Sequence, residues 1–292
     1  MELPMFLQQL TPEWRAWLGD NVARGCSAES MQELLVKGGY AVALSAAAVA
    51  EARESHLSRE LLRGQALPAG QTLLRPTIDL QSANQLQCSD GQQVRITAVL
   101  DHPQLVLFED MLSDEECDQL IALADQRMSR STVVDEQLGE SRPHEARTSA
   151  GGWFQRGEFA LLARIEARLA ELLHWPVDHG EGLQVLRYGV GGEYRAHFDY
   201  FNPALPGSQR HLQAGGQRVG TCILYLDEVA AGGGTRFPTL GFEVRPKRGA
   251  ALYFASVDAA GQEDPVTLHA GVPVIAGVKY IATKWLRQRA YQ

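Results

Sequence analysis

The chain has 292 residues, 45% of them hydrophobic and 21% charged, which is typical of a soluble globular protein. Its formal net charge of −8 provides no basic surface, so nucleic acid is not an expected partner. The four cysteines lie far apart without a Cys-x-x-Cys pair, which argues against a zinc ribbon or disulfide scaffold and favours a reducing cytoplasm. The N-terminus has no signal-peptide pattern and no apolar run is long enough to cross a bilayer, so we expect a cytoplasmic protein without membrane contact.

The first part of the chain has helical periodicity. Thr11-Pro12 is a typical helix start, with the threonine as N-cap and proline at the first helical position. Ser27 is a second N-cap, before a helix that ends at Gly38-Gly39, and a third helix is expected over 43–62. These helices predict a small N-terminal domain.

We place this helical domain at residues 1–66 and a linker at 67–78, because periodicity stops and Pro and Gly appear near Gln65–Gln71. Packing or dimerisation is the first interpretation of the helices, and substrate docking is the alternative. The remainder, 79–292, is predicted to be the main domain.

The main domain begins with mixed elements. Alternation predicts strands at 93–100 and 105–108. Ser113 and Glu116 form a capping-box pattern at a helix start, and 157–175 is a further expected helix. The polar stretch 128–150 has no periodicity and is predicted to be a loop.

From Leu183 the pattern changes to short strands separated by glycine-rich corners. Helices followed by many short strands, without βαβ alternation, favour an α+β fold with an antiparallel sandwich or barrel backed by helices. The expected strands are 183–188, 218–226, 234–237, 242–246, 250–254, 266–269 and 278–287.

The stretch that contains His197 and Asp199 has the residue types of a metal-binding site. His197 and Asp199 are two residues apart, so in an extended chain their side chains point to the same face. We take His269 as the third member of the set. Two histidines and one carboxylate with open coordination positions form the facial triad of non-heme Fe(II) oxygenases. This pattern predicts an iron site.

From about Leu105 onward the chain resembles the prolyl 4-hydroxylase branch of the 2-oxoglutarate/Fe(II)-dependent dioxygenases. The resemblance implies a double-stranded β-helix (jelly-roll) barrel, with its metal and cosubstrate core at 183–288. The matching blocks are Leu112–Cys117, Arg147–Ser149, Leu183–Tyr188, His197–Phe201, Gly216–Arg218, Thr221–Leu226, Gly232–Pro238, Pro246–Gly249, Leu268–Val274 and Ala282–Trp285.

The resemblance implies that His197, Asp199 and His269 hold Fe(II), and that 2-oxoglutarate, dioxygen and ascorbate as a reductant take part. Related halogenases have a small residue in place of the carboxylate ligand, so Asp199 favours a hydroxylase.

The resemblance also assigns the cosubstrate site. Lys279 matches the family's partner of the 2-oxoglutarate 5-carboxylate, Thr283 is its hydroxyl neighbour, and Tyr188 matches a tyrosine that helps to hold the cosubstrate. A buried carboxylate needs such a cation and hydrogen bonds. Lys284 points to the other face and is expected at the surface, while Trp285 either fills the barrel or lines the pocket.

Arg147, Ser149 and Arg218 match positions that line the peptide groove in family members, with surface hydrogen bonding as the alternative role. The loops 128–150 and 202–216 are candidate lids. The chain departs from the family pattern at Arg195, Gly234, Ala255 and Ala270. Because Arg195 reverses a charge beside the groove, it affects the expected substrate.

The sequence therefore predicts an Fe(II)- and 2-oxoglutarate-dependent dioxygenase that hydroxylates prolyl residues in a peptide or protein. The alternatives are an oxygenase that acts on another residue or on a free small molecule, and a cupin-like metal-binding protein without catalysis. A lysine ten residues after the last ligand favours the enzyme, because a plain metal-binding barrel needs no anion partner.

Overall fold

The computed structural model describes residues 6–24, 26–62, 74–80, 83–134, 141–143 and 147–291. Three helices come first, as predicted: α1 (Pro12–Ala23), α2 (Ala28–Lys37) and α3 (Val42–Leu62). Thr11 caps α1 by accepting a hydrogen bond from the backbone N–H of Trp14, and Ser27 caps α2 in the same way. None of the described helices has the length and apolar character needed to span a membrane.

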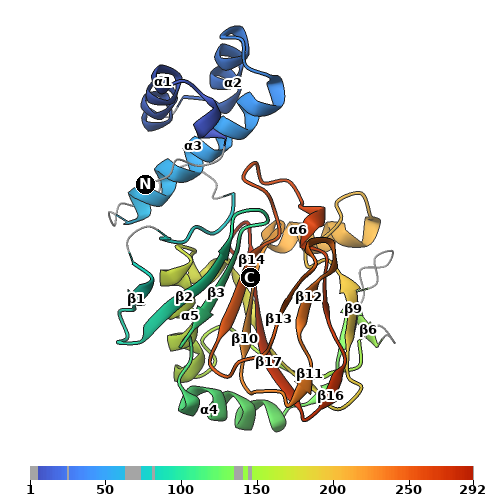
Figure 1. Ribbon diagram of the computed structural model, residues 1–292. Coiled ribbons are helices and arrows are strands. Elements are labelled where there is room, and N and C mark those ends of the chain that lie inside the picture. Colours follow the sequence, from blue (N-terminus) through green and yellow to red (C-terminus); the bar gives the residue numbers. More distant parts are fainter. Residues whose placement is uncertain are drawn as a thin grey trace.

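The three helices share a core of their own. Its most deeply buried side chains include Leu18, Met31, Leu35 and Val49. Figure 1 shows α1–α3 together at one end of the molecule, beyond the sheets. The buried residues of the two other cores all lie at or beyond Cys88.

A nine-stranded antiparallel sheet forms the centre of the molecule. In spatial order its strands are β1 (Gln85–Gln87), β2 (Gln93–Leu100), β3 (Leu105–Glu109), β14 (Ala251–Ala255), β10 (Arg218–Tyr225), β17 (Lys279–Arg287), β8 (Gly180–Tyr188), β7 (Ala150–Phe154) and β4 (Ser129–Arg130).

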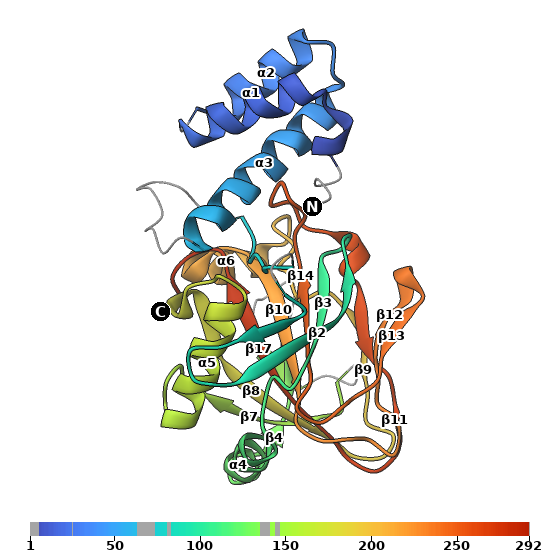
Figure 2. The same ribbon diagram turned by 60° about the vertical axis from the view of Figure 1, so that its left-hand side comes forward.

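A second antiparallel sheet has four strands, β13 (Phe242–Val244), β12 (Thr235–Phe237), β15 (His269–Gly271) and β9 (Tyr194–His197). Two small ribbons pair β11 (Ala231–Gly232) with β16 (Val274–Ala276), and β5 (Thr132–Val134) with β6 (Ser141–Pro143). Figure 2 shows the four-stranded sheet beside the central one.

Alternation along the central strands separates two cores. In β10, Cys222 and Leu224 face one core and Ile223 and Tyr225 face the other. The first core includes the apolar stripes of α4 (Asp114–Asp125) and α5 (Ala160–Leu172), so these helices cover one face of the sheet. The second includes Phe237 of β12, and it lies between the two sheets. The result is a mixed fold of helices and large antiparallel sheets.

Three predicted segments differ in the structure. Within 128–150, β4, β5 and β6 pair as short strands, and 202–216 contains a 3-10 turn (Pro206–Ser208) followed by α6 (Gln209–Gly215). The expected strand 266–269 is instead a 3-10 turn over Pro265–Thr267, followed by β15. Such short elements depend on their pairing partners, which local alternation does not reveal. Residues 135–140 and 144–146 lie outside the described residues, and so do residues 67–73 of the predicted linker 67–78.

Candidate active site

Strand pairing between β9 and β15 brings the three predicted ligands together. His197 and His269 are direct cross-strand partners, and Asp199 follows two residues after the end of β9. His197 Nε2 lies 3.7 Å from Asp199 Oδ1, and His269 Nε2 lies 3.6 Å from Asp199 Oδ2. One ligand atom from each residue lies within 4.8 Å of the others. Pairing of distant strands thus produces the cluster that the sequence predicted.

The outer nitrogen of each imidazole has a backbone partner. His197 Nδ1 lies 2.8 Å from the Arg195 carbonyl oxygen, and His269 Nδ1 lies 2.9 Å from the Thr267 carbonyl oxygen. A carbonyl oxygen can only accept, so each Nδ1 carries the proton. Both Nε2 lone pairs are therefore directed at the centre of the cluster, as metal-binding histidines require.

The carboxylate is also held in place. Thr221 Oγ1 donates to Asp199 Oδ2 at 2.7 Å, and both residues are buried. Burial by itself would raise the pKa of Asp199, but His269 and His197, together with the Arg218 charge and the Thr221 hydrogen bond, lower that pKa. Burial and then the neighbouring His269 lower the pKa of His197, so its imidazole is neutral at pH 7.

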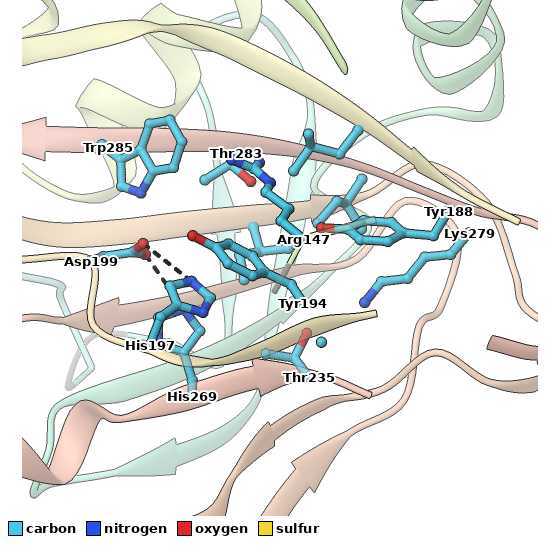
Figure 3. A pocket seen from close by; sticks show the side chains of 14 residues that line it. Arg147, Tyr188, Tyr194, His197, Asp199, Thr235, His269, Lys279, Thr283 and Trp285 are labelled. Atoms are coloured by element: carbon cyan, nitrogen blue, oxygen red, sulfur yellow. Dashed lines mark ion pairs between the residues drawn. The ribbon is translucent and has the colours of Figure 1, made fainter. Parts of the chain in front are cut away.

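The cluster forms one end of a pocket between the two sheets. The space between its lining residues, together with the open solvent at its mouth, is about 410 Å³. Figure 3 shows His197, Asp199 and His269 at one end, and Lys279 with Tyr188 at the other.

The face of β17 predicted from alternation lines this pocket. Lys279, Ile281, Thr283 and Trp285 all contribute to its wall. Lys279 is 2% exposed, and burial lowers the pKa of its ammonium group to about 8, against an opposing attraction from Glu243. At pH 7 most of the lysine is therefore protonated. A buried cation and a metal cluster at opposite ends suit a ligand with one anionic end and one chelating end.

Tyr188 stands beside the lysine, with Lys279 Nζ 5.5 Å from its ring centroid. Burial raises the pKa of Tyr188, although hydrogen bonds from Ser149 and Arg147 act in the opposite direction. The phenol is therefore neutral and able to donate a hydrogen bond at the lysine end of the pocket.

The three predicted substrate-binding residues have different environments. Arg147 lies inside the pocket, where its Nη2 donates to Gln184 Oε1 at 2.8 Å. Ser149 is 1% exposed and donates to Ser131 Oγ, so a groove would contact it only indirectly. Arg218 binds the Glu181 carboxylate through Nε at 2.6 Å and through Nη2 at 2.8 Å.

Several residues of the site did not stand out in the sequence. The Tyr194 ring stacks on the His197 ring with 3.6 Å between their centroids. The Arg147 guanidinium lies 4.8 Å from the centroid of the same Tyr194 ring. Glu181 binds both Arg218 and Arg287. The alternation of residues along β8 shows which face Glu181 is on, but it does not show that two buried arginines bind its carboxylate. Those arginines come from other strands.

The expectation for Lys284 was wrong. This side chain is 2% exposed, and its ammonium group pairs with Glu166 of α5 and donates to the Glu181 carbonyl. It does point away from the pocket, as the alternation of β17 predicted, but that face is covered by α5 and is not exposed to solvent. Trp285 is 6% exposed and lines the pocket, with the Arg218 guanidinium 4.0 Å from its ring centroid.

Two of the four departures from the family pattern, Gly234 and Arg195, lie near the site. A Cβ at Gly234 would lie 2.3 Å from Glu243 Oε1, so a carboxylate from β13 fills the space beside a residue that lacks a side chain. The negative charge of this same carboxylate raises the pKa of Lys279, against the effect of burial. The Arg195 side chain is 61% exposed and pairs with Glu193, so its charge faces solvent beside the metal cluster.

The donor set fits Fe(II). Two imidazole nitrogens and one carboxylate oxygen on one side leave other positions open, which is the arrangement of non-heme iron oxygenases. Within the described residues, this is the one grouping of three histidine, cysteine or acidic side chains close enough to hold an ion.

Comparison with known proteins agrees with this geometry. Residues 183–287 match the 2OG-Fe(II) oxygenase superfamily. Probable prolyl 4-hydroxylase 3 of Arabidopsis thaliana is 38% identical over 209 residues, which cover 65% of this chain and 71% of that protein. The alpha-1 subunit of rat (Rattus norvegicus) prolyl 4-hydroxylase is 38% identical over 192 residues, or 66% of this chain and 36% of the subunit.

Among solved structures, the viral collagen prolyl hydroxylase of Paramecium Bursaria Chlorella virus-1, in complex with 2-oxoglutarate, is 31% identical. The match has a TM-score of 0.50 and covers 65% of this chain and 99% of the viral one. The cofactor set of this chain is accordingly Fe(II), 2-oxoglutarate and dioxygen. The chain belongs to the prolyl 4-hydroxylase-like family of 2-oxoglutarate/Fe(II)-dependent oxygenases.

Proposed function

We propose that this protein hydroxylates prolyl residues within a peptide or protein. The observation that carries the proposal is a single pocket with the His197, Asp199 and His269 cluster at one end and the buried Lys279 at the other. The names of the relatives, which are prolyl 4-hydroxylases, support the choice of substrate.

In this proposal the two imidazole Nε2 atoms and the Asp199 carboxylate hold Fe(II). Bound Fe(II) and 2-oxoglutarate together activate dioxygen, with conversion of 2-oxoglutarate to succinate and carbon dioxide and transfer of one oxygen atom to a substrate C–H bond. Lys279 and Thr283 bind the 5-carboxylate, and Tyr188 donates a hydrogen bond at the same end. Leu186, Ile223 and Ile281 form an apolar wall that excludes water from the reacting groups.

The substrate side of the proposal concerns Arg147, Ser149 and Arg218. Arg147 is the one of the three that lines the pocket, between Tyr188 and Tyr194. Because it lies so near the cosubstrate end, we expect Arg147→Ala to raise KM for both 2-oxoglutarate and peptide. Arg218 contacts Glu181 and the Trp285 ring, and its Nη1 donates to the backbone carbonyl of Asp199 at 3.4 Å, which ties it to the metal cluster.

At the level of architecture we propose a double-stranded β-helix for 79–292 with the metal and cosubstrate core at 183–288, and a separate helical domain at 1–66 for packing, dimerisation or substrate docking. The separate core of α1–α3 supports this division. A cytoplasmic location and the use of ascorbate stay predictions.

The test is product mass spectrometry with Fe(II) and 2-oxoglutarate, using proline-containing peptides and free L-proline under identical conditions. We expect a peptide product 16 Da heavier, in step with succinate, because a peptide presents neutral backbone groups that side-chain hydrogen bonds can hold. Oxygenated free proline with no peptide product would contradict the peptidyl substrate and leave the oxygenase assignment intact.

A further inference from the structure

The turn that precedes His269 is built around a buried aspartate. Asp264 is 4% exposed and caps the Pro265–Thr267 turn, where its Oδ1 accepts from the Val266 N–H at 3.0 Å. Its own backbone N–H donates to the Ser256 carbonyl at 3.1 Å, which ties the turn to the end of β14. The cap and this anchor define where the turn lies.

Thr267 closes the turn and contacts the metal cluster. It is 1% exposed, and both its N–H and its Oγ1 donate to the Asp264 carbonyl, at 3.1 and 2.6 Å. Its own carbonyl accepts the Nδ1 proton of His269 at 2.9 Å. A continuous set of hydrogen bonds therefore runs from Asp264 through Thr267 to a predicted metal ligand.

The two histidines of the cluster are held differently. The carbonyl that orients His197 belongs to Arg195, inside strand β9, whose pairing with β15 sets the direction of the backbone. Thr267 lies two residues before the start of β15, so no ladder orients its carbonyl. The direction of that carbonyl depends on the turn alone.

We propose that Asp264 and Thr267 are positioning residues of the metal centre, which hold the carbonyl that fixes the tautomer and the ring orientation of His269. The inference rests on the proposed metal centre. Partners in the second layer around a metal commonly change affinity by about 10- to 100-fold when they are removed.

Among the residues that the structure describes, one oxygen of the buried Asp264 carboxylate lacks a hydrogen bond, which is energetically unfavourable. Within the described residues its Oδ2 accepts no hydrogen bond, and His102 Nδ1 lies 3.7 Å from it. A buried carboxylate oxygen without a donor is unfavourable. The oxygen that caps the turn is therefore the useful part of the side chain, and Asp264→Asn, which keeps that oxygen, is predicted to preserve the metal site.

The experiment titrates Co(II) into the full-length metal-free protein by calorimetry. Thr267→Val keeps the shape of the side chain and removes its hydroxyl, and we expect it to weaken Co(II) binding by about tenfold. We expect a loss of Co(II) affinity of similar size in Asp264→Ala. Thr267→Ser and Asp264→Asn are expected to bind within about twofold of wild type, because each keeps the oxygen that the proposal requires.

The control is Asp258→Ala in the same loop. Asp258 Oδ1 accepts from the Ala260 and Gln262 N–H groups, so it caps a similar turn that has no bond to His269. A second measurement follows the His269 Nδ1 proton by NMR in protein labelled with ¹⁵N-histidine. We predict that this proton exchanges with solvent faster in Thr267→Val than in wild type, and at the wild-type rate in Asp258→Ala.

Wild-type Co(II) affinity in both Thr267→Val and Asp264→Ala would overturn the inference, whatever their melting temperatures. An equal loss in Asp258→Ala would overturn it as well, because any loosened turn would then have the same effect. If Asp264→Ala fails to fold, the Thr267→Val and Thr267→Ser pair decides. Unchanged binding in His269→Ala would instead refute the proposed metal centre itself.

Discussion

At the residue scale, the cluster is prepared for a metal by hydrogen bonds on its outer side. Carbonyls of Arg195 and Thr267 take the Nδ1 protons, and Thr221 holds the carboxylate. These bonds leave two imidazole nitrogens and one carboxylate oxygen for a metal ion on the inner side of the cluster.

We predict that His197→Ala, Asp199→Ala or His269→Ala each abolishes succinate production while the protein stays folded, because two ligands hold Fe(II) too weakly. Succinate is measured by mass spectrometry and folding by circular dichroism. The matched control is His56→Ala, since this histidine lies in α3 and outside the cluster. A His269→Ala variant with wild-type turnover would show that the ligand assignment is wrong.

Lys279 is predicted to decide cosubstrate affinity. Lys279→Ala removes the buried ammonium group at the far end of the pocket, so we expect the KM for 2-oxoglutarate to rise at least tenfold, with Co(II) affinity largely kept. Lys279→Arg keeps the charge but changes the geometry and is expected to be intermediate. An unchanged KM in Lys279→Ala would make this lysine purely structural.

The lowered pKa of Lys279 predicts a pH dependence. Burial sets that pKa to about 8 in the free protein, so the protonated fraction falls as pH rises through 8. Because the 5-carboxylate binds the protonated form, we expect affinity for 2-oxoglutarate to be constant below pH 7 and to fall about tenfold per pH unit above 8. Calorimetry on Co(II)-loaded protein measures it. Lys279→Arg stays charged, so its affinity is predicted to be flat across this range.

At the element scale, β17 serves both faces of the central sheet. Alternate residues from Lys279 to Trp285 line the pocket, while Lys284 on the opposite face joins β17 to α5 through Glu166 and to β8 through the Glu181 carbonyl. Thus the strand that carries the cosubstrate lysine is fixed from behind by a buried ion pair.

We predict that Lys284→Met lowers the free energy of unfolding by about 3–5 kcal/mol, because it leaves the Glu166 carboxylate buried without a cation. The double variant Lys284→Met/Glu166→Gln removes that charge yet keeps an acceptor for the Gly157 N–H, so part of the loss is expected to be recovered. Urea denaturation measures both. Lys37→Met, in an exposed pair with Glu33, is the control and is expected to change stability little.

At the scale of the whole molecule, the hydrophobic cores fall into two separate groups. One is the small core of α1–α3, and the other comprises the two cores on either side of the central sheet. The segment 74–80 already belongs to the larger part, since the Thr77 N–H donates to the Leu173 carbonyl and Ile78 and Leu80 pack on the core beside α5.

We predict that a truncated protein beginning at Leu74 folds and converts 2-oxoglutarate to succinate, because every residue of the proposed site lies at or beyond Arg147. Solubility, circular dichroism and succinate production are the measurements. A truncated protein that aggregates would show that the helices cover the barrel. Modification of a peptide but not of a full-length protein substrate would assign the helices to docking.

The sequence by itself determined which residues are candidates for chemical roles and which local elements surround them. His197, Asp199, His269 and the pocket face of β17 follow from spacing, alternation and family resemblance, because an alternation of two residues directs side chains to one face whatever the surrounding fold. Helix caps at Thr11, Ser27 and Ser113 are equally local, since each depends on contacts within four residues.

Only the tertiary structure decided what lies opposite each face and which distant groups meet. Lys284 alternates as predicted, yet α5 buries it, and Glu181 meets two arginines that come from other strands. The 3-10 turn before His269 and the short strands within 128–150 likewise depend on their partners. Burial and long-range pairing arise from segments far apart in the chain, and a local pattern contains no information about them.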